Sequence, residues 1–114
     1  MTIQIHTTAI VHPEAMIGAD VTIGPYAIVG RASIGHGSVL HPHVVISDGV
    51  NLGSEVEVFP GAFVGKEPKG AGAIARQPQF NHSIQIGNQC SIGPNAVIYY
   101  DVEIGRNTLI GDGA

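Results

Sequence analysis

The amino-acid sequence predicts an all-β fold in which very short strands stack as repeated triangular coils of a parallel β-helix. Three observations predict it: apolar residues recur every six positions, Ile and Val supply 27 residues against three Leu, and Gly supplies 16 of 114 residues. A six-residue period matches neither an α-helix nor a simple alternating hairpin. It fits a short strand followed by a tight turn, and coils of three such units would stack at about 4.8 Å, the usual strand spacing.

The period runs through the chain in three segments separated by two breaks. Its key apolar positions are Ile5, Val11, Ile17, Ile23 and Val29, then Ile34, Leu40, Ile46, Leu52, Val58 and Val64, and finally Ile86, Ile92, Ile98, Ile104 and Ile110. The first break, after Val29, is one residue short, and the second, after Val64, holds a long insertion. The residue two places before each key position is small or β-branched in nearly every repeat, which predicts a second inward-facing column.

The register of the coils can be tested within the sequence. With three repeats in a coil, one edge stacks Ile17, Ile34, Leu52, Ile86 and Ile104, and Gly follows each of them. We expect this glycine column to mark turns that need a positive φ. The register predicts about five coils in a single domain spanning residues 1–114, with a narrow apolar interior, so that any active site lies outside the coil.

Composition excludes several classes of protein. Hydrophobic residues make up 44% and charged residues 12% of the chain, which excludes a disordered tail and disfavours a helical bundle. The net charge of −4 gives no sign of a nucleic-acid partner. A single cysteine, Cys90, excludes a disulfide framework, and its inward position predicts a buried, inert thiol. No membrane span or signal peptide is evident, so we expect a cytoplasmic protein.

The repeat resembles that of the hexapeptide-repeat acyltransferases. The opening, residues 5–25, is similar to the start of the UDP-N-acetylglucosamine O-acyltransferases of lipid A synthesis, whereas residues 59–70 and 98–101 are more similar to nucleotide-sugar N-acyltransferases. The resemblance implies a left-handed parallel β-helix and a homotrimer with active sites between subunits. It also implies transfer from acetyl-CoA, another acyl-CoA or an acyl carrier protein to an amino or hydroxyl group of a nucleotide-linked sugar. We expect the chain to be the N-terminal part of a longer acyltransferase.

The insertion, residues 66–83, holds three of the chain's five basic residues, Lys66, Lys69 and Arg76. An insertion of this length in a compact repeat is usually functional or mobile. We expect it to border the site and its basic residues to contact phosphates of coenzyme A or of a nucleotide sugar. The alternative is a solvated loop whose charges serve solubility.

Histidine is the usual general base near neutral pH, and the chain has six. His82, where the insertion rejoins the repeat, is the candidate catalytic base. Tyr99, Tyr100 and Asp101 are candidate substrate contacts, because tyrosine rings can stack on a nucleobase and a carboxylate can bind sugar groups. Packing between subunits is the alternative for them. His41 and His43 are further candidate substrate contacts, with a surface role as the alternative.

Two other functions remain open from the sequence. A γ-type zinc carbonic anhydrase has the same fold and needs three histidines around zinc; His36 and His41 would supply two, and His43 or His82 of another chain the third. The acidic residues and Gln that would accompany such a site are absent from the sequence, and we expect no metal. The other alternative is a non-catalytic trimerising β-helix, in keeping with the absence of a matching Asn-x-His-x-x-His segment from the sequence.

Overall fold

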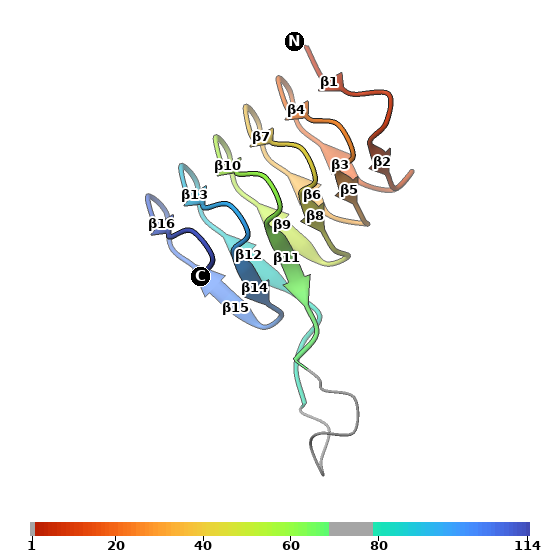
Figure 1. Cartoon of the computed structure of the whole chain (residues 1–114). Coiled ribbons are helices and arrows are strands. Elements are labelled where there is room, and N and C mark those ends of the chain that lie inside the picture. Colours follow the sequence, from red (N-terminus) through yellow and green to blue (C-terminus); the bar gives the residue numbers. More distant parts are fainter. Residues whose placement is uncertain (1, 69–78) are drawn as a thin grey trace.

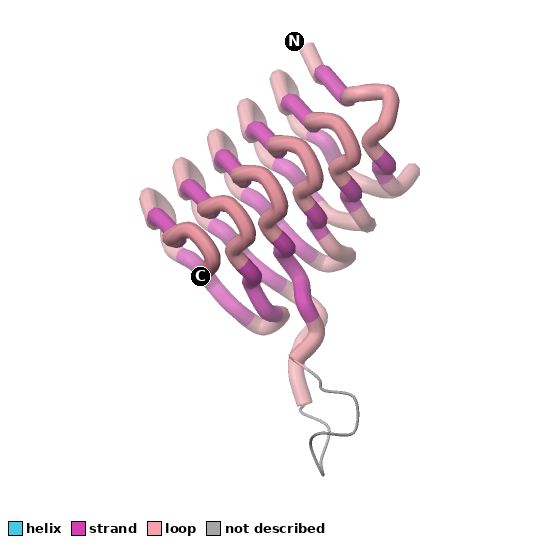
Figure 2. The backbone as a smooth tube through the Cα atoms, viewed as in Figure 1, coloured by secondary structure: helices cyan, strands magenta, loops and turns pink. Residues whose placement is uncertain are grey.

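The computed structural model describes residues 2–68 and 79–114, and this part of the chain contains sixteen short strands and no helix. The strands follow one another around a three-sided coil, and the coils stack side by side along one axis (Figure 1). Turns and strands alternate regularly along the backbone (Figure 2). The expected all-β solenoid of about five coils is therefore confirmed, and it is consistent with a left-handed parallel β-helix.

All strand pairs are parallel, and each face of the prism is one sheet. Sheet A contains β1 (Gln4–Ile5), β4 (Thr22–Ile23), β7 (Val39–Leu40), β10 (Glu57–Val58), β13 (Ser91–Ile92) and β16 (Leu109–Ile110). Sheet B contains β2 (Ile10–Val11), β5 (Ile28–Val29), β8 (Val45–Ile46), β11 (Phe63–Lys66) and β14 (Val97–Tyr99). Sheet C contains β3 (Met16–Ile17), β6 (Ser33–Ile34), β9 (Val50–Leu52), β12 (Ile84–Ile86) and β15 (Val102–Ile104). We name the turns between them the A/B, B/C and C/A edges.

The register predicted from the six-residue period is confirmed. In sheet C, Ile34 pairs with Ile17 and with Leu52, and Ile86 pairs with Leu52 and with Ile104. The insertion leaves from the B/C edge between β11 and β12 (Figure 1). It begins at Glu67 rather than at Lys66, because β11 passes through an irregularity between Val64 and Lys66 and pairs Lys66 with Tyr99.

The interior is a closed column of apolar side chains, as expected. The key residues and the residues two places before them are almost all buried from Val21 to Ile98. The polar side chains of this column are bonded: Ser38 Oγ donates to Gly53 O at 3.0 Å, and Cys90 Sγ donates to Gly105 O at 3.1 Å. Cys90 is 1% exposed, as predicted.

The glycine column on the C/A edge has a different cause from the one expected. The positive-φ glycines are Gly37, Gly49, Gly61, Gly65 and Gly113, none of which belongs to the column. Instead, a Cβ at Gly18 would lie 2.9 Å from His36 N, and one at Gly87 would lie 2.5 Å from Arg106 N. Close approach between the backbones of successive coils therefore excludes a side chain there. Positive φ falls two residues later in each of the five coils, at Asp20, Gly37, Glu55, Gln89 and Asn107.

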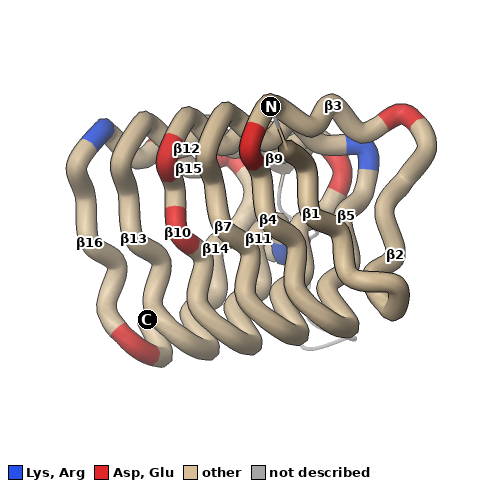
Figure 3. Tube along the Cα trace, turned by 90° about the horizontal axis from the view of Figure 1, so that it is seen from above, with Lys and Arg blue, Asp and Glu red and all other residues tan. Residues whose placement is uncertain are grey.

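Charged residues are sparse and lie mostly at the turns (Figure 3). Among the described residues, no helix is long and apolar enough to cross a membrane. The edges of the coil therefore carry most of the charged groups.

Candidate functional site

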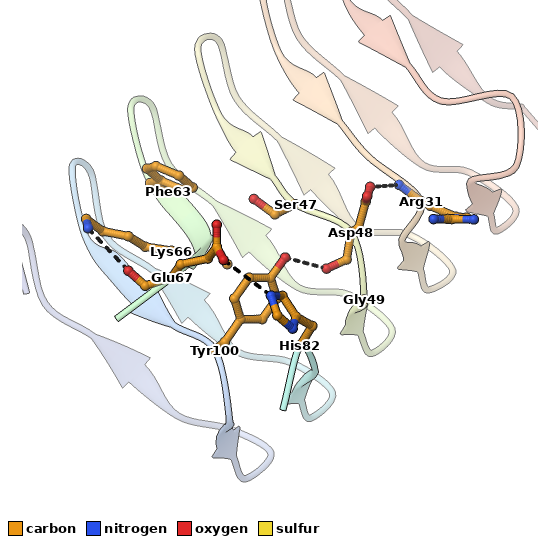
Figure 4. Close-up of a pocket in the computed structure, with 10 residues that line it drawn as sticks. Arg31, Ser47, Asp48, Gly49, Phe63, Lys66, Glu67, His82 and Tyr100 are labelled. Carbon is orange, nitrogen blue, oxygen red and sulfur yellow. Dashed lines mark hydrogen bonds and ion pairs between the residues drawn. The ribbon is translucent and has the colours of Figure 1, made fainter. Parts of the chain in front are cut away.

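An open cleft lies outside the coil, on the B/C edge, where the insertion leaves and rejoins the repeat (Figure 4). Its volume is about 810 Å³, and it is open to solvent. Three coils line it with Arg31, Asp48 and Tyr100. The coil between Asp48 and Tyr100 carries the insertion, whose two ends contribute Glu67 and His82. This position outside a packed interior agrees with the expectation from the sequence.

The two ends of the insertion bring a histidine and a carboxylate together. His82 Nε2 lies 3.4 Å from Glu67 Oε2, and the His82 side chain is 61% exposed. When Nε2–H donates to the carboxylate, Nδ1 is the ring nitrogen that can accept a proton. A histidine oriented by a carboxylate at the mouth of a cleft is a suitable general base.

Tyr100 connects the end of the insertion to the coil that carries Asp48. Its hydroxyl donates to Asp48 O at 2.7 Å, and its ring centroid lies 4.9 Å from that of His82 and 6.0 Å from that of Phe80. Because the residue is only 7% exposed, it positions the end of the insertion rather than offering an open ring face. Burial raises the pKa of Tyr100, and the nearby negative charges of Asp48 and Glu67 also raise this pKa.

This raised pKa predicts a stability that depends on pH in the alkaline range. The folded pKa of Tyr100 lies above the unfolded value of 10.0, so the contribution is complete below pH 10 and is lost as pH rises through the folded pKa. We expect the melting temperature of the wild-type chain to fall above pH 10 more steeply than that of Tyr100→Phe. Equal alkaline slopes for the two proteins would contradict this assignment.

The neighbours of Tyr100 have separate roles. Tyr99 is 43% exposed, and Lys66 Nζ lies 5.3 Å from its ring centroid. Asp101 accepts a hydrogen bond from Asn81 Nδ2 at 3.4 Å, and its backbone N–H donates to Ser83 O at 2.8 Å. Lys66 lines the cleft; Lys69 and Arg76 lie outside the described residues.

His41 and His43 lie on the A/B edge, away from the cleft. His41 Nε2 is 2.7 Å from Glu57 Oε2, and its ring stacks on Phe59 with centroids 5.0 Å apart. His43 stacks on Tyr26 at 5.3 Å. His41 is thus packed and half-buried, with 31% of its side chain exposed.

The histidines considered for zinc are separated within one chain. His36 lies on the C/A edge, His41 and His43 on the A/B edge and His82 on the B/C edge. In the part of the chain that is described, no group of three or more His, Cys, Asp or Glu residues could hold a metal ion. A zinc site of the carbonic anhydrase type therefore gains no support from this structure.

Three charged residues of the cleft, Arg31, Asp48 and Glu67, were not predicted from the sequence. Arg31 stands at the short phase break after Val29, and Asp48 follows the key residue Ile46 by two. Their shared column on the B/C edge, from which the insertion leaves, was readable from the register, but nothing in the period distinguished these two side chains from their neighbours. Glu67 meets His82 only because the insertion folds back to its starting point.

The sequence and fold match known transferases. Residues 83–114 match the family model described as bacterial transferase hexapeptide (six repeats). This part of the chain carries the bacterial hexapeptide repeat. The chain resembles the hexapeptide-repeat acyltransferases, as expected from its sequence. One relative is the bifunctional protein GlmU of Anaeromyxobacter dehalogenans, 30% identical over 89% of this chain and 21% of the relative.

A second relative is the acyl-acyl-carrier-protein–UDP-N-acetylglucosamine O-acyltransferase of Saccharophagus degradans, 49% identical over 37% of this chain and 17% of the relative. The chain therefore spans about a fifth of the length of these curated relatives. Among solved structures, the UDP-N-acetylglucosamine acyltransferase of Francisella novicida has a TM-score of 0.81 at 28% identity, covering 95% of this chain and 41% of that one.

A third comparison concerns the fold alone. A mutant GDP-perosamine N-acetyltransferase from Caulobacter crescentus, solved in complex with CoA and GDP-perosamine, has a TM-score of 0.83 at 19% identity. It covers 99% of this chain and 47% of that chain. The solenoid therefore superposes on both of these transferases, and the fold by itself does not define what a protein acts on.

Proposed function

We propose that the protein is an acyltransferase that moves an acyl group from acyl-CoA, or from an acyl carrier protein, to an amino or hydroxyl group of a nucleotide-linked sugar. The pairing of His82 with Glu67 at the mouth of the cleft is the observation that carries the proposal. The relatives support the reaction class, since two of them are named as acyltransferases acting on UDP-N-acetylglucosamine. A structural neighbour bound to CoA supports a CoA thioester as the donor.

In the proposed reaction, the acceptor nitrogen or oxygen attacks the thioester carbonyl carbon directly. His82 Nδ1 accepts the acceptor's proton while Glu67 stabilises the imidazolium that forms. The new C–N or C–O bond replaces the C–S bond when the tetrahedral intermediate collapses, and the CoA thiolate leaves with a proton from His82. The chain forms no covalent intermediate; its contribution is to orient the two substrates and to transfer the proton.

Charges around the cleft fit substrates that carry both phosphate and polar groups. Arg31 and Lys66 supply positive charge to the lining, and Asp48 and Glu67 supply negative charge. The cations suit donor or nucleotide phosphates, and the carboxylates suit hydroxyl or amino groups of a sugar. We propose a cytoplasmic reaction, in keeping with an acyl-CoA donor.

We also propose that the protein is a homotrimer with the site between subunits. Its outward residues on sheet B form an apolar ladder of Ile10, Ile28, Val45, Phe63 and Val97. The outward residues of sheet C are mostly polar, namely Met16, Ser33, Asn51, Gln85 and Glu103. Phe63 belongs to the ladder and also lines the cleft. A second subunit packed against sheet B would therefore cover the open side of the cleft.

Light scattering tests the assembly. We expect three times the chain mass of 11.8 kDa for the wild-type protein and dissociation for Ile28→Glu, because a charge would be buried in the interface. Ser33→Glu, at an outward position of sheet C, is the matched control and should leave the mass unchanged. A wild-type monomer, or a trimer unaffected by Ile28→Glu, would contradict this interface.

Thiol release tests the acyl-transfer reaction. Wild-type protein with acetyl-CoA should release free CoA only when a nucleotide sugar acceptor is added, and the product should gain one acetyl group by mass spectrometry. UDP-linked and GDP-linked sugars with a free amino group, and UDP-N-acetylglucosamine, form the acceptor panel. Acyl-carrier-protein thioesters are the second donor. Failure of every donor and acceptor combination with a correctly assembled protein would reject the proposed function.

A further inference from the structure

His82 reaches the cleft on a short segment, residues 80–83, that leads from the insertion into β12; we call this segment the return limb. In sheet C, β12 lies between β9 and β15, and the residues that directly precede these two strands are Gly49 and Asp101. The return limb therefore runs between two turns of the B/C edge. Gly49 and His82 both line the cleft (Figure 4), so the contacts of the limb with these turns place the His82 ring.

The turn at Asp101 holds the return limb by hydrogen bonds. Asp101 N–H donates to Ser83 O at 2.8 Å, and Asn81 Nδ2 donates to Asp101 Oδ1 at 3.4 Å. Tyr100, the preceding residue, packs its ring beside that of His82, with centroids 4.9 Å apart. On this side the limb is thus held at His82 and at both of its neighbours.

The turn at Gly49 holds the return limb by close approach of two backbones. Gly49 O accepts a hydrogen bond from Ile84 N–H at 3.3 Å. A Cβ on Gly49 would overlap the backbone oxygen of His82 and stand 3.2 Å from the carbonyl carbon of His82. The His82 carbonyl group therefore occupies the space that a side chain at position 49 would fill.

The conformation of this turn does not by itself require glycine. Gly49 has a φ of +82°, and Asp101, at the equivalent position two coils later, has a φ of +68°. The described part of the chain contains eight residues other than glycine at positive φ, among them Asn95 and Asn107. Side chains are thus compatible with such turns, and what distinguishes position 49 is the approach of His82 O.

A side chain at position 49 would displace the return limb rather than the coil. Gly49 N–H donates to Arg31 O at 3.0 Å, and Arg31 N–H donates to Asp48 Oδ1 at 2.7 Å, so the turn is tied to the preceding coil. His82, in contrast, has a side chain that is 61% exposed. Exposed segments with few buried contacts move at the lowest cost, so the His82 backbone would yield first.

We propose that Gly49 is a positioning residue for His82. By leaving room for the His82 carbonyl group, Gly49 allows the ring to stand with Nε2 3.4 Å from Glu67 Oε2 at the mouth of the cleft. Its effect on the reaction passes through the general base, because glycine has no side chain with which to take part. The catalytic consequence rests on the proposed acyl transfer, but the placement of the ring can be measured without any substrate.

The test is Gly49→Ala, read first by NMR of the histidine rings. The rings of Phe80 and Tyr100 lie with centroids 4.6 and 4.9 Å from that of His82, and aromatic rings shift the frequencies of nearby protons. The His82 signals are assigned by their loss in His82→Asn. We expect them to move toward the frequencies of free histidine in Gly49→Ala.

The second readout is steady-state acyl transfer by the same variant. We expect Gly49→Ala to lower kcat about 10- to 100-fold, because misplacing a reacting group by about 1 Å can cost about 100-fold. KM for both substrates should change less, since the variant keeps every charged group of the cleft.

Gly37→Ala is the matched control. Gly37 has a φ of +71° and lies on the C/A edge, where a Cβ would meet the flexible side chain of Glu55, 3.3 Å from its Cγ, rather than backbone. Both substitutions carry the cost of a side chain at positive φ, so urea denaturation should show a loss of stability for each. Only Gly49→Ala should alter the His82 signals and kcat.

A second variant covers the case in which Gly49→Ala does not fold. Gly49→Asn then takes its place, with Gly37→Asn as its control. Asn95 and Asn107 show that asparagine adopts a positive φ in this chain, and the Cβ of Asn at position 49 would meet the same oxygen of His82.

The proposal is overturned if a folded Gly49 variant keeps the wild-type His82 signals, or if it keeps the wild-type kcat although those signals have moved. It is also overturned if the Gly37 variant reproduces both effects, because a general loss of stability would then be the cause. Absence of acyl transfer by the wild-type protein would instead reject the proposed function, and the NMR comparison would still decide whether Gly49 places the His82 ring.

Discussion

Replacing Gly35 with Ala is expected to lower the free energy of unfolding by about 3 kcal/mol, at the upper end of the usual cost of overpacking. The added Cβ would overlap the carbonyl group of Gly53 and stand 2.7 Å from Ser54 N. These are backbone atoms of the next coil, so relief requires the two coils to separate. Separation would lengthen the backbone hydrogen bonds between them, such as the 3.0 Å bond from Gly35 N–H to Leu52 O.

Gly105→Ala provides the control within the same column. A Cβ at Gly105 would meet no atom within 4 Å, and Gly105 has no positive φ. This substitution should change the stability by no more than about 0.5 kcal/mol, as surface substitutions usually do. Urea denaturation of the two variants gives the comparison. Equal losses of stability would mean that the column serves a conformational need rather than close approach of the coils.

Replacing His82 with Asn is expected to lower kcat for acyl transfer by about 10²- to 10⁴-fold, the usual contribution of a positioned general base. Asn keeps a polar group of similar reach near Glu67, which lies 3.4 Å from His82 in the wild-type chain, but it cannot take up the acceptor's proton. KM for both substrates should change little, because the substitution removes proton transfer rather than substrate binding.

His36→Asn is the matched control for this experiment. His36 is also an exposed histidine near a carboxylate, with Nδ1 3.8 Å from Asp20 Oδ2, but it lies on the C/A edge. We expect wild-type kcat for it. If His82→Asn retains full activity while the wild-type protein transfers acyl groups, the base is another group and the assignment of His82 is wrong.

The register of the coil was predictable because it depends on a strictly local property. Each six-residue unit carries its own inward apolar residue and its own turn, so Ile34 and Leu52 could be paired without knowledge of the rest of the fold. The reason for the Gly column was not predictable in the same way. A close approach between Gly35 and Gly53 is a relation between coils, and only the structure distinguishes it from a need for positive φ.

The candidate site, too, was predictable from the sequence only in part. The insertion and His82 were identifiable as departures from the repeat, whereas the partner of His82 was not, because 15 residues separate it from Glu67. Tyr100 was predicted as a substrate contact from its side-chain type, but the structure places its ring beneath the insertion and its hydroxyl on Asp48 O. Burial is decided by the path of the neighbouring segment, which side-chain chemistry does not encode.

The sequence by itself determined the solenoid, its number of coils and the edge from which the insertion leaves, since all three follow from the spacing of inward apolar residues. The tertiary structure alone decided which groups meet at the edges: the His82 ring with the Glu67 carboxylate, and the Tyr100 hydroxyl with the backbone oxygen of Asp48. The physical reason is that a repeat fixes how each coil stacks on the next, whereas contacts at the edges depend on where each turn and the insertion direct their side chains.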